Sequence, residues 1–195
     1  MSNSSDQNQL RALDAALTVF ARYGYQRASM ADIAREAGVS RPSLYLWFEN
    51  KPALFNALAD HLKVQALTGA DAAWSADRDF ESNLEATILA KDLTFYTLLH
   101  ASPHGAELMS VDAALTASMV AELDAGFAGT LAARAAEAEA AGLIDLAAFD
   151  DAAGFGRTIG LLASGLKHEV RDEAAWRAGV RALCRMTARA VLRRS

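Results

Sequence analysis

The segment 41–45 carries side chains that can contact the edges of DNA bases: Arg41, Pro42, Ser43 and Tyr45. An Arg guanidinium can donate two hydrogen bonds to guanine O6 and N7, and a Ser hydroxyl can donate or accept. The Pro and Tyr rings can contact the methyl group of thymine. These contacts require a helix that enters the major groove with its N-terminal residues facing the bases.

The residues around this segment predict two short helices joined by a tight turn. Ser29 and Asp32 form a capping-box pattern at the start of the first helix. Gly38 ends that helix, because glycine readily adopts a left-handed conformation. Ser40 caps the second helix, and Pro42 fits its first turn. This pattern is typical of a helix-turn-helix, although a helical hairpin in an ordinary bundle can show the same caps.

Donors at the edges of this motif are expected to contact DNA phosphates: Ser29, Tyr45, Trp47 and Lys51. Bulk charge gives this interpretation little support. The chain has a formal net charge of −5, and acidic and basic residues balance within 1–61. DNA binding would therefore depend on the placement of a few donors, while the acidic remainder of the chain is repelled by DNA.

The N-terminal part of the chain resembles the DNA-binding head of the tetracycline-repressor (TetR) family over about residues 10–60. The matching residues are Gly24-Tyr25, Ser29-Met30-Ala31-Asp32-Ile33-Ala34, Ala37-Gly38-Val39-Ser40, Ser43-Leu44-Tyr45, Phe48, Lys51 and Leu54-Phe55. The resemblance supports the DNA-contact positions given above. At Trp47 the family more often has His or another polar residue, so packing is an alternative role for this indole.

The resemblance implies an all-α chain in two parts. Residues 1–50 would form a three-helix helix-turn-helix domain, and residues 51–195 a helical-bundle domain for effector binding and dimerisation. The composition agrees, because 52% of the residues are apolar and only 3 are Pro. Helical periodicity predicts helices at about 7–23, 51–70, 82–100, 106–109, 112–141, 146–168 and 172–192.

The sequence favours a cytoplasmic protein that does not contact membranes. Residues 1–9 lack the apolar region of a signal peptide, and no apolar run approaches the roughly 20 residues of a membrane span. The single cysteine, Cys184, excludes an internal disulfide framework and is expected to be buried in a helix.

The predicted body is rich in large apolar and aromatic residues, with a few polar groups among them. A mostly apolar cavity with sparse polar groups is typical of small-molecule sites. We therefore expect an effector pocket for an apolar or aromatic molecule; the alternative is that these residues close a solid core. The set consists of Phe95, Tyr96, Leu99, His100, His104, Met109, Met119, Leu123, Phe127 and Phe155.

Metal, cofactor and catalytic sites are not predicted. His100 and His104 are four residues apart, but Pro103 between them should break the helix and separate their side chains. The sequence has no GxSxG motif and no paired-carboxylate motif, so we expect no enzyme activity.

Small residues recur every four positions from Ala152, which lets another helix approach closely. Together with an apolar stripe in the last helix they suggest half of a four-helix dimer interface. The proposed interface residues are Gly156, Gly160, Ser164, Trp176, Val180, Leu183, Thr187 and Val191. The alternative is ordinary packing within one chain, and the family resemblance favours the interface.

These expectations combine into one hypothesis. The chain would bind a palindromic DNA operator as a homodimer, act as a repressor, and release DNA when a small apolar or aromatic molecule binds. The alternatives are an all-α small-molecule-binding protein or enzyme with a vestigial head, and a protein-binding adaptor.

Overall fold

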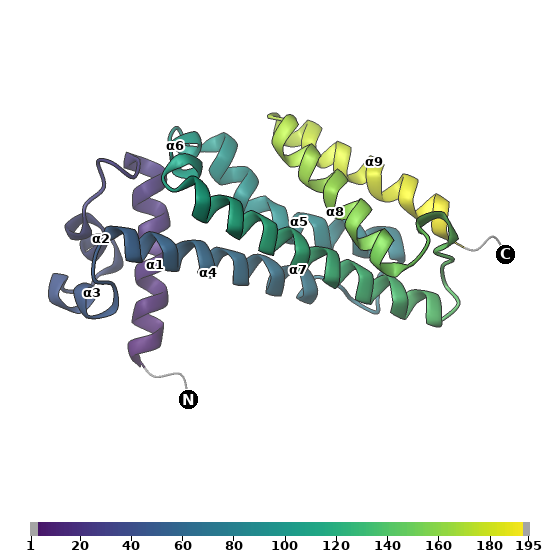
Figure 1. Ribbon diagram of the computed structural model, residues 1–195, viewed down its shortest axis with the longest axis horizontal. Helices are drawn as coiled ribbons and strands as arrows, with labels where there is room; N and C mark the ends of the chain where they lie inside the picture. Colours follow the sequence, from purple (N-terminus) through teal and green to yellow (C-terminus); the bar gives the residue numbers. More distant parts are fainter. Residues whose placement is uncertain (1–3, 193–195) are drawn as a thin grey trace. The chain divides into compact units, whose positions relative to one another are not determined.

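The computed structural model describes residues 4–192; within this range the side chains of Ser4, Leu99 and Ala101 lie outside the described part. The helices are α1 (Ser4–Tyr23), α2 (Met30–Ala37), α3 (Arg41–Trp47), α4 (Lys51–Ala72), α5 (Phe80–Ala101), α6 (Gly105–Ser110), α7 (Ala113–Ala140), α8 (Ala152–Glu169) and α9 (Glu173–Val191), with a 3₁₀ turn η1 (Ala147–Phe149) before α8 (Figure 1). Among these residues no strand forms, which confirms the predicted all-α fold.

The described part of the chain divides into two compact units. Unit 1 consists of residues 4–64 and 97–119, and unit 2 of residues 65–96 and 120–192. Neither unit is a continuous stretch of sequence, because α4, α5 and α7 each contribute residues to both. The predicted domain boundary at 50/51 remains a prediction; α4 begins at Lys51 and contributes residues to both units.

The helix-turn-helix of unit 1 is built from the predicted local signals. The Ser29 hydroxyl accepts a hydrogen bond from the Asp32 N–H at 3.2 Å, and the Asp32 carboxylate accepts one from the Ser29 N–H, which confirms the capping box. Gly38 ends α2 with φ +67°, and its N–H donates to the last turn of the helix. The Ser40 hydroxyl accepts from the Ser43 N–H and so begins α3.

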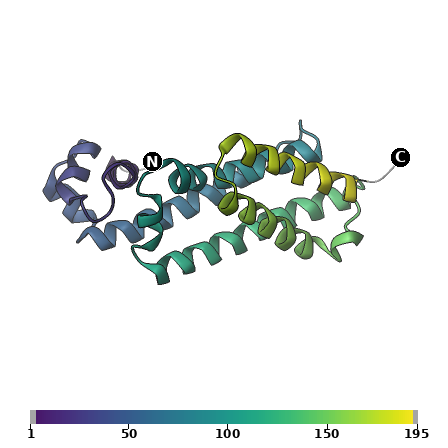
Figure 2. The same ribbon diagram turned by 90° about the horizontal axis from the view of Figure 1, so that it is seen from above.

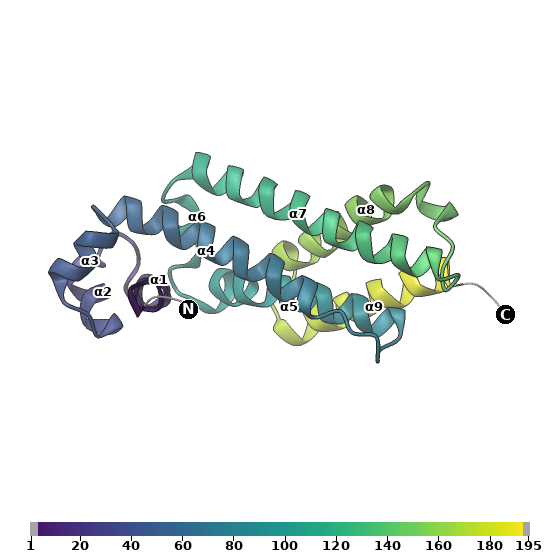
Figure 3. The ribbon, with the colours of Figure 1, turned by 90° about the horizontal axis from the view of Figure 1, so that it is seen from below.

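Helices α2 and α3 lie beside α1, whose apolar side forms the core of the head (Figure 3). Phe20 is fully buried, and its ring lies 5.4 Å from that of Tyr25 and 5.8 Å from that of Phe55. The Arg11 guanidinium donates to the Ala37 carbonyl at 2.8 Å, which satisfies one of the free carbonyls at the C-terminus of α2. The head therefore depends on both apolar packing and side-chain caps.

Unit 2 has an apolar core formed by helical side chains from α4, α5, α7, α8 and α9. Tyr96 stacks on Trp176 with ring centroids 4.3 Å apart, and Phe155 contacts Phe80 and Phe149. Cys184 is fully buried, as predicted, and burial raises the pKa of its thiol to about 12. The thiol is therefore a packing group at neutral pH.

The segment before α8 differs from the prediction. The helix expected from residue 146 begins only at Ala152, because the chain is first held in another conformation. The Asp145 N–H donates to the Val191 carbonyl at 2.7 Å, and Asp150 has φ +66°. The Asp151 carboxylate then accepts from the Gly154 N–H and caps α8. This long-range tie to the end of α9 could not be recognised from local periodicity.

The small-residue stripe of α8 packs inside the protomer. Gly156 is buried, and a Cβ atom at this position would overlap the backbone carbonyl of Ala128 in α7. Gly160 is also buried and faces the ring of Phe127. The neighbouring helices α8 and α9 are seen side by side from above in Figure 2. These two glycines therefore pack against another helix of the same chain, which is the alternative to a role in a dimer interface.

We expect Gly156→Ala and Gly165→Ala to change stability in opposite directions. Gly156→Ala should lower the free energy of unfolding by about 1–3 kcal/mol, because the new methyl group forces α8 away from the α7 backbone. Gly165 is exposed in the same helix with open space around its Cβ position, so alanine should stabilise the chain there by about 0.5–1 kcal/mol. Urea unfolding of both variants tests this, and equal effects would contradict the close helix contact.

Candidate nucleic-acid interface

Helix α3 is anchored by one side chain and exposes most of the others. Leu44 is fully buried against the head core, while Arg41, Pro42 and Tyr45 are exposed and Ser43 is half-buried. The Ser43 hydroxyl lies 2.8 Å from the Ser40 hydroxyl, so the start of α3 also fixes this potential base contact. The side chains predicted to contact bases thus share one short, capped helix with a free surface.

Leu46 belongs to this surface and was not included in the predicted set. Its side chain is 84% exposed, the most exposed large apolar residue among those described. The signal was present in the sequence, because a residue two positions after the inward-facing Leu44 lies on the opposite side of a helix. An exposed apolar side chain here can contact a thymine methyl group.

Lys51 holds the loop between α1 and α2. Its ammonium donates to the Tyr25 carbonyl at 2.8 Å and to the Ala28 carbonyl at 3.0 Å, and lies 3.4 Å from the Gln26 carbonyl. It also lies 4.5 Å from the centre of the Tyr25 ring. The three donors of this ammonium are therefore directed at the protein backbone, while the phosphate contact predicted for Lys51 remains a prediction.

The other predicted phosphate donors occupy different environments. The exposed Ser29 hydroxyl donates to Asp32 at 2.6 Å, which is one cause of the lowered pKa of that carboxyl group; Arg35 is another. The ionised Asp32 sits at the N-terminus of α2, where the helix dipole favours a negative charge. Trp47 is half-buried and Tyr45 is 45% exposed.

A second group fixes the same loop from far away in the sequence. Glu107 accepts a hydrogen bond from the Gln26 N–H at 3.0 Å, which is the main cause of the lowered pKa of its carboxyl group. His104 lies 3.2 Å from the other Glu107 oxygen, and Ser102 donates to the Ala21 carbonyl at 2.9 Å. Unit 1 therefore ties the residues around α6 to the DNA-binding head, through contacts that span 81 residues.

The residues predicted to form the effector pocket do not all lie in one unit. Phe95, Tyr96, Leu123, Phe127 and Phe155 are buried in unit 2. The remaining described members belong to unit 1: His100, His104, Met109 and Met119. Leu99 has a side chain outside the described part. A single cavity enclosed by this set remains a prediction.

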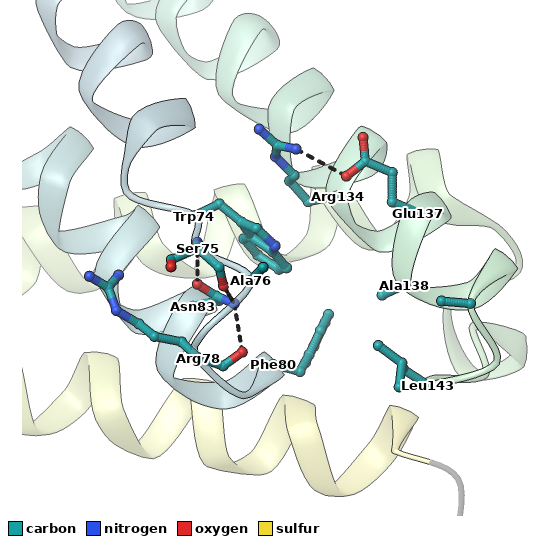
Figure 4. A pocket seen from close by; sticks show the side chains of 11 residues that line it. Trp74, Ser75, Ala76, Arg78, Phe80, Asn83, Arg134, Glu137, Ala138 and Leu143 are labelled. Carbon is teal, nitrogen blue, oxygen red and sulfur yellow. Dashed lines mark hydrogen bonds and ion pairs between the residues drawn. The ribbon is translucent and has the colours of Figure 1, made fainter.

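Unit 2 contains a pocket of about 290 Å³ next to the loop between α4 and α5 (Figure 4). Its polar groups are engaged within the chain: the Asn83 side chain accepts from the Ser75 N–H and donates to the carbonyls of Ser75 and Arg78. Arg134 pairs with Glu137 and with Asp71 outside the pocket. The lining residues are Trp74, Ser75, Ala76, Arg78, Phe80, Asn83, Arg134, Glu137, Ala138, Ala141 and Leu143, which include none of the predicted effector residues.

The predicted dimer residues mostly face the core of the protomer. Trp176 and Val180 are fully buried, and Val191 and Thr187 are nearly so, because α9 packs its apolar stripe into unit 2. Ser164 and Leu183 are half-buried. The same helices expose other large apolar side chains, namely Leu161 (71%), Leu162 (50%) and Met186 (70%).

Among residues 4–192, no helix combines the length and the apolar character needed to span a bilayer.

Comparison with known proteins agrees with this geometry. Residues 12–58 match the family model described as "Bacterial regulatory proteins, tetR family". The uncharacterized HTH-type transcriptional regulator YvdT of Bacillus subtilis is 33% identical over 78 residues, and the match covers 40% of this chain and 40% of YvdT. The chain thus matches less than half the length of this curated relative.

Solved structures show the same fold over nearly the whole chain. A putative TetR-family transcriptional regulator from Mesorhizobium loti has a TM-score of 0.71 at 15% identity, covering 98% of this chain and 100% of that one. SmeT, the repressor of the Stenotrophomonas maltophilia multidrug efflux pump SmeDEF, has a TM-score of 0.64 at 18% identity, covering 95% and 90%. SmeT has also been solved in complex with triclosan.

We expect Lys51→Met to destabilise the free protein by about 1–3 kcal/mol, because the loop carbonyls lose their charged donor. Arg27→Met is the matched control, since Arg27 is an exposed, positively charged residue in the same loop. Thermal unfolding without DNA measures the difference. If Lys51 acts only on phosphate, both variants should unfold like the parent, and Lys51→Met should instead lower the salt slope of DNA binding by about 0.9.

Proposed function

We propose that the chain is a cytoplasmic transcriptional repressor of the TetR family, which binds DNA as a homodimer and responds to a small molecule; the match of residues 12–58 to the family model supports this. The observation that carries this proposal is the surface of α3, where a capped helix anchored by Leu44 exposes Arg41, Pro42, Tyr45 and Leu46. No catalytic activity is part of the proposal.

In this proposal α3 lies in the major groove with its N-terminal residues at the base edges. Arg41 pairs with a guanine, Ser43 donates or accepts at a neighbouring base, and the side chains of Tyr45 and Leu46 contact thymine methyl groups. Acidic and basic residues balance within 1–61, so we expect the head to recognise its DNA sequence through a few directed contacts and not through overall charge. Ser29 and Trp47 serve at the phosphates, and Lys51 contributes by fixing the loop beside them.

A dimer would present two such helices to the two halves of a palindromic operator. We place the interface on the exposed apolar side chains of α8 and α9, with Leu161 and Met186 as its centre. Large apolar side chains left exposed on neighbouring helices are a usual mark of a protein interface. This proposal modifies the predicted set: Gly156, Trp176 and Val180 are buried within the protomer, so we leave them out of the proposed contact with the partner.

Repression would be relieved by a small apolar or aromatic molecule bound in the body. Such a ligand shifts the population only if it binds the DNA-incompetent conformer more tightly. The hydrogen bond from Gln26 to Glu107 supports a route for this response, because any movement of α6 changes the support of the head loop. The complex of SmeT with triclosan shows that a repressor of this fold can bind an aromatic compound.

Arg41→Ala should weaken binding to the operator by about 1–3 kcal/mol and relax the preference at one base pair, since a guanine contact is lost. Arg185→Ala removes the same charge from the exposed side of α9 and should leave binding close to the parent value. The operator can be selected from random duplexes retained by the purified protein, and gel-shift titrations then compare the variants. Equal affinities for Arg41→Ala and the parent would contradict the assignment of α3.

Leu161→Glu should convert the dimer to a monomer, because a carboxylate placed in an apolar interface loses its hydration. Leu143 is 60% exposed outside α8 and α9, so Leu143→Glu supplies a control with the same chemical change. Sedimentation velocity at several concentrations measures the result. A Leu161→Glu variant that sediments like the parent would show that this side chain lies outside the interface.

A further inference from the structure

Three charged side chains meet inside unit 2. The Lys167 ammonium from α8 donates to Asp92 Oδ1 at 2.9 Å, and the Lys91 ammonium lies 3.1 Å from the same oxygen. The side chains of Lys91 and Asp92 are 0% exposed, and that of Lys167 is 7% exposed. Two ammonium groups, one from α5 and one from α8, therefore converge on one oxygen of a single buried carboxylate.

Aromatic rings surround this charged cluster. The Lys91 ammonium lies 4.3 Å from the centre of the Phe127 ring, and the Lys167 ammonium lies 5.6 Å from that of Phe95. The faces of aromatic rings attract cations, but they supply only part of the solvation that an ammonium loses on burial. Each ammonium group of the cluster therefore lies beside an aromatic ring, Phe127 for Lys91 and Phe95 for Lys167.

The polar groups of the cluster are incompletely satisfied among the described residues. The Lys91 ammonium forms no hydrogen bond of good geometry there, and Asp92 Oδ2 has no partner. Burial lowers the pKa of Lys91, and the neighbouring positive charge of Lys167 acts in the same direction. The carboxylate of Asp92 opposes this shift, as does the half-buried Asp124 from α7.

A structural role alone accounts poorly for the second lysine. A buried carboxylate and one ammonium already form a neutral pair, and Lys167 provides that pair with a well-formed hydrogen bond. Lys91 adds an ammonium whose burial costs free energy without a hydrogen bond in return. The three buried side chains of the cluster therefore carry two positive charges and one negative charge, and the half-buried Asp124 is a further carboxylate that acts on Lys91.

We propose that Lys91 and Lys167 bind the anionic group of the effector, which is a small monocarboxylate with an apolar or aromatic body. A single excess positive charge matches a monoanion better than a phosphate dianion. The aromatic rings around the lysines would contact the body of the ligand, and Asp92 holds both ammonium groups in position. This inference rests on the ligand response proposed above and narrows the chemical class of the ligand.

The probes are matched pairs of a carboxylic acid and its neutral primary amide: phenylacetate, 4-phenylbutyrate, 2-naphthoate and decanoate with their amides. Thermal shift and calorimetric titration are carried out on the full chain without DNA. At least one acid should stabilise the protein progressively with concentration, and its amide should bind at least about tenfold more weakly, as expected for loss of a charge-assisted hydrogen bond. Absence of binding by all four acids, or equal binding of acid and amide, overturns the proposal.

Variants locate the site and separate it from general electrostatics. Lys91→Met should weaken binding of the acid about tenfold or more and leave the amide unchanged. Arg157→Met removes the same charge from the exposed face of α8 and should have no such effect. Asp92→Asn keeps the side-chain oxygen that accepts from the ammonium groups but removes the competing negative charge, so this variant should bind the acid more tightly. A failure of Lys91→Met to fold therefore leaves a test of opposite sign. Unchanged acid binding in Lys91→Met, or in Asp92→Asn, contradicts the site.

Operator binding of the ligand-free parent separates this inference from the proposed function. If the parent retains no specific duplex, the repressor proposal fails, while the acid titrations still decide the anion site. If the parent binds its operator and the acids do not bind, the anion site alone fails. A bound acid that leaves the operator complex intact overturns the effector role assigned to it.

Discussion

Helices of seven and eight residues are too short to be stable in water by themselves, and the recognition surface of this protein is made of two such helices. The candidate DNA-binding surface therefore depends on groups that fix the helix ends and the loop before them. Side-chain caps begin both helices, Gly38 ends the first, and Leu44 anchors the second. The Lys51 ammonium adds a charged tie to three loop carbonyls. Groups that fix helix ends before a ligand arrives reduce the ordering that binding would have to supply.

Hydrogen bonds from the residues around α6 also support the DNA-binding head. Glu107 accepts from the backbone of the head loop, and Ser102 donates to the end of α1. The Glu107 carboxyl group is ionised at neutral pH and so makes a charge-assisted hydrogen bond with the Gln26 N–H, and this bond in turn lowers the pKa of the carboxyl group. A loop held from two sides, by Lys51 and by Glu107, gives a physical basis for coupling a change in α6 to the geometry of the head.

Unit 2 shows a different balance, in which an apolar core encloses buried charges. Tyr96, Trp176 and Phe155 close most of the interior, so the aromatic richness noticed in the sequence serves largely as core. The exception is the cluster around Asp92, where ammonium groups remain buried at a cost in stability. Natural cores rarely retain such a group without a use for it, which is the physical reason to connect this cluster with ligand binding.

The sequence by itself determined the features that depend on neighbours three or four residues away: the capping box, the glycine exit, the N-cap of α3 and the helical character of the chain. It also identified the family of the head, because matching residues stand there in fixed register. Only the tertiary structure decided which side of a helix faces the protein. The sequence pattern of Trp176 and Val180 fits an interface or a core equally well, and the structure buries both side chains in the core of unit 2, where the Tyr96 ring stacks on Trp176. Lys51, Glu107 and Asp92 acquire their roles from partners 23 to 81 residues away, and a local pattern carries no information about contacts at that separation.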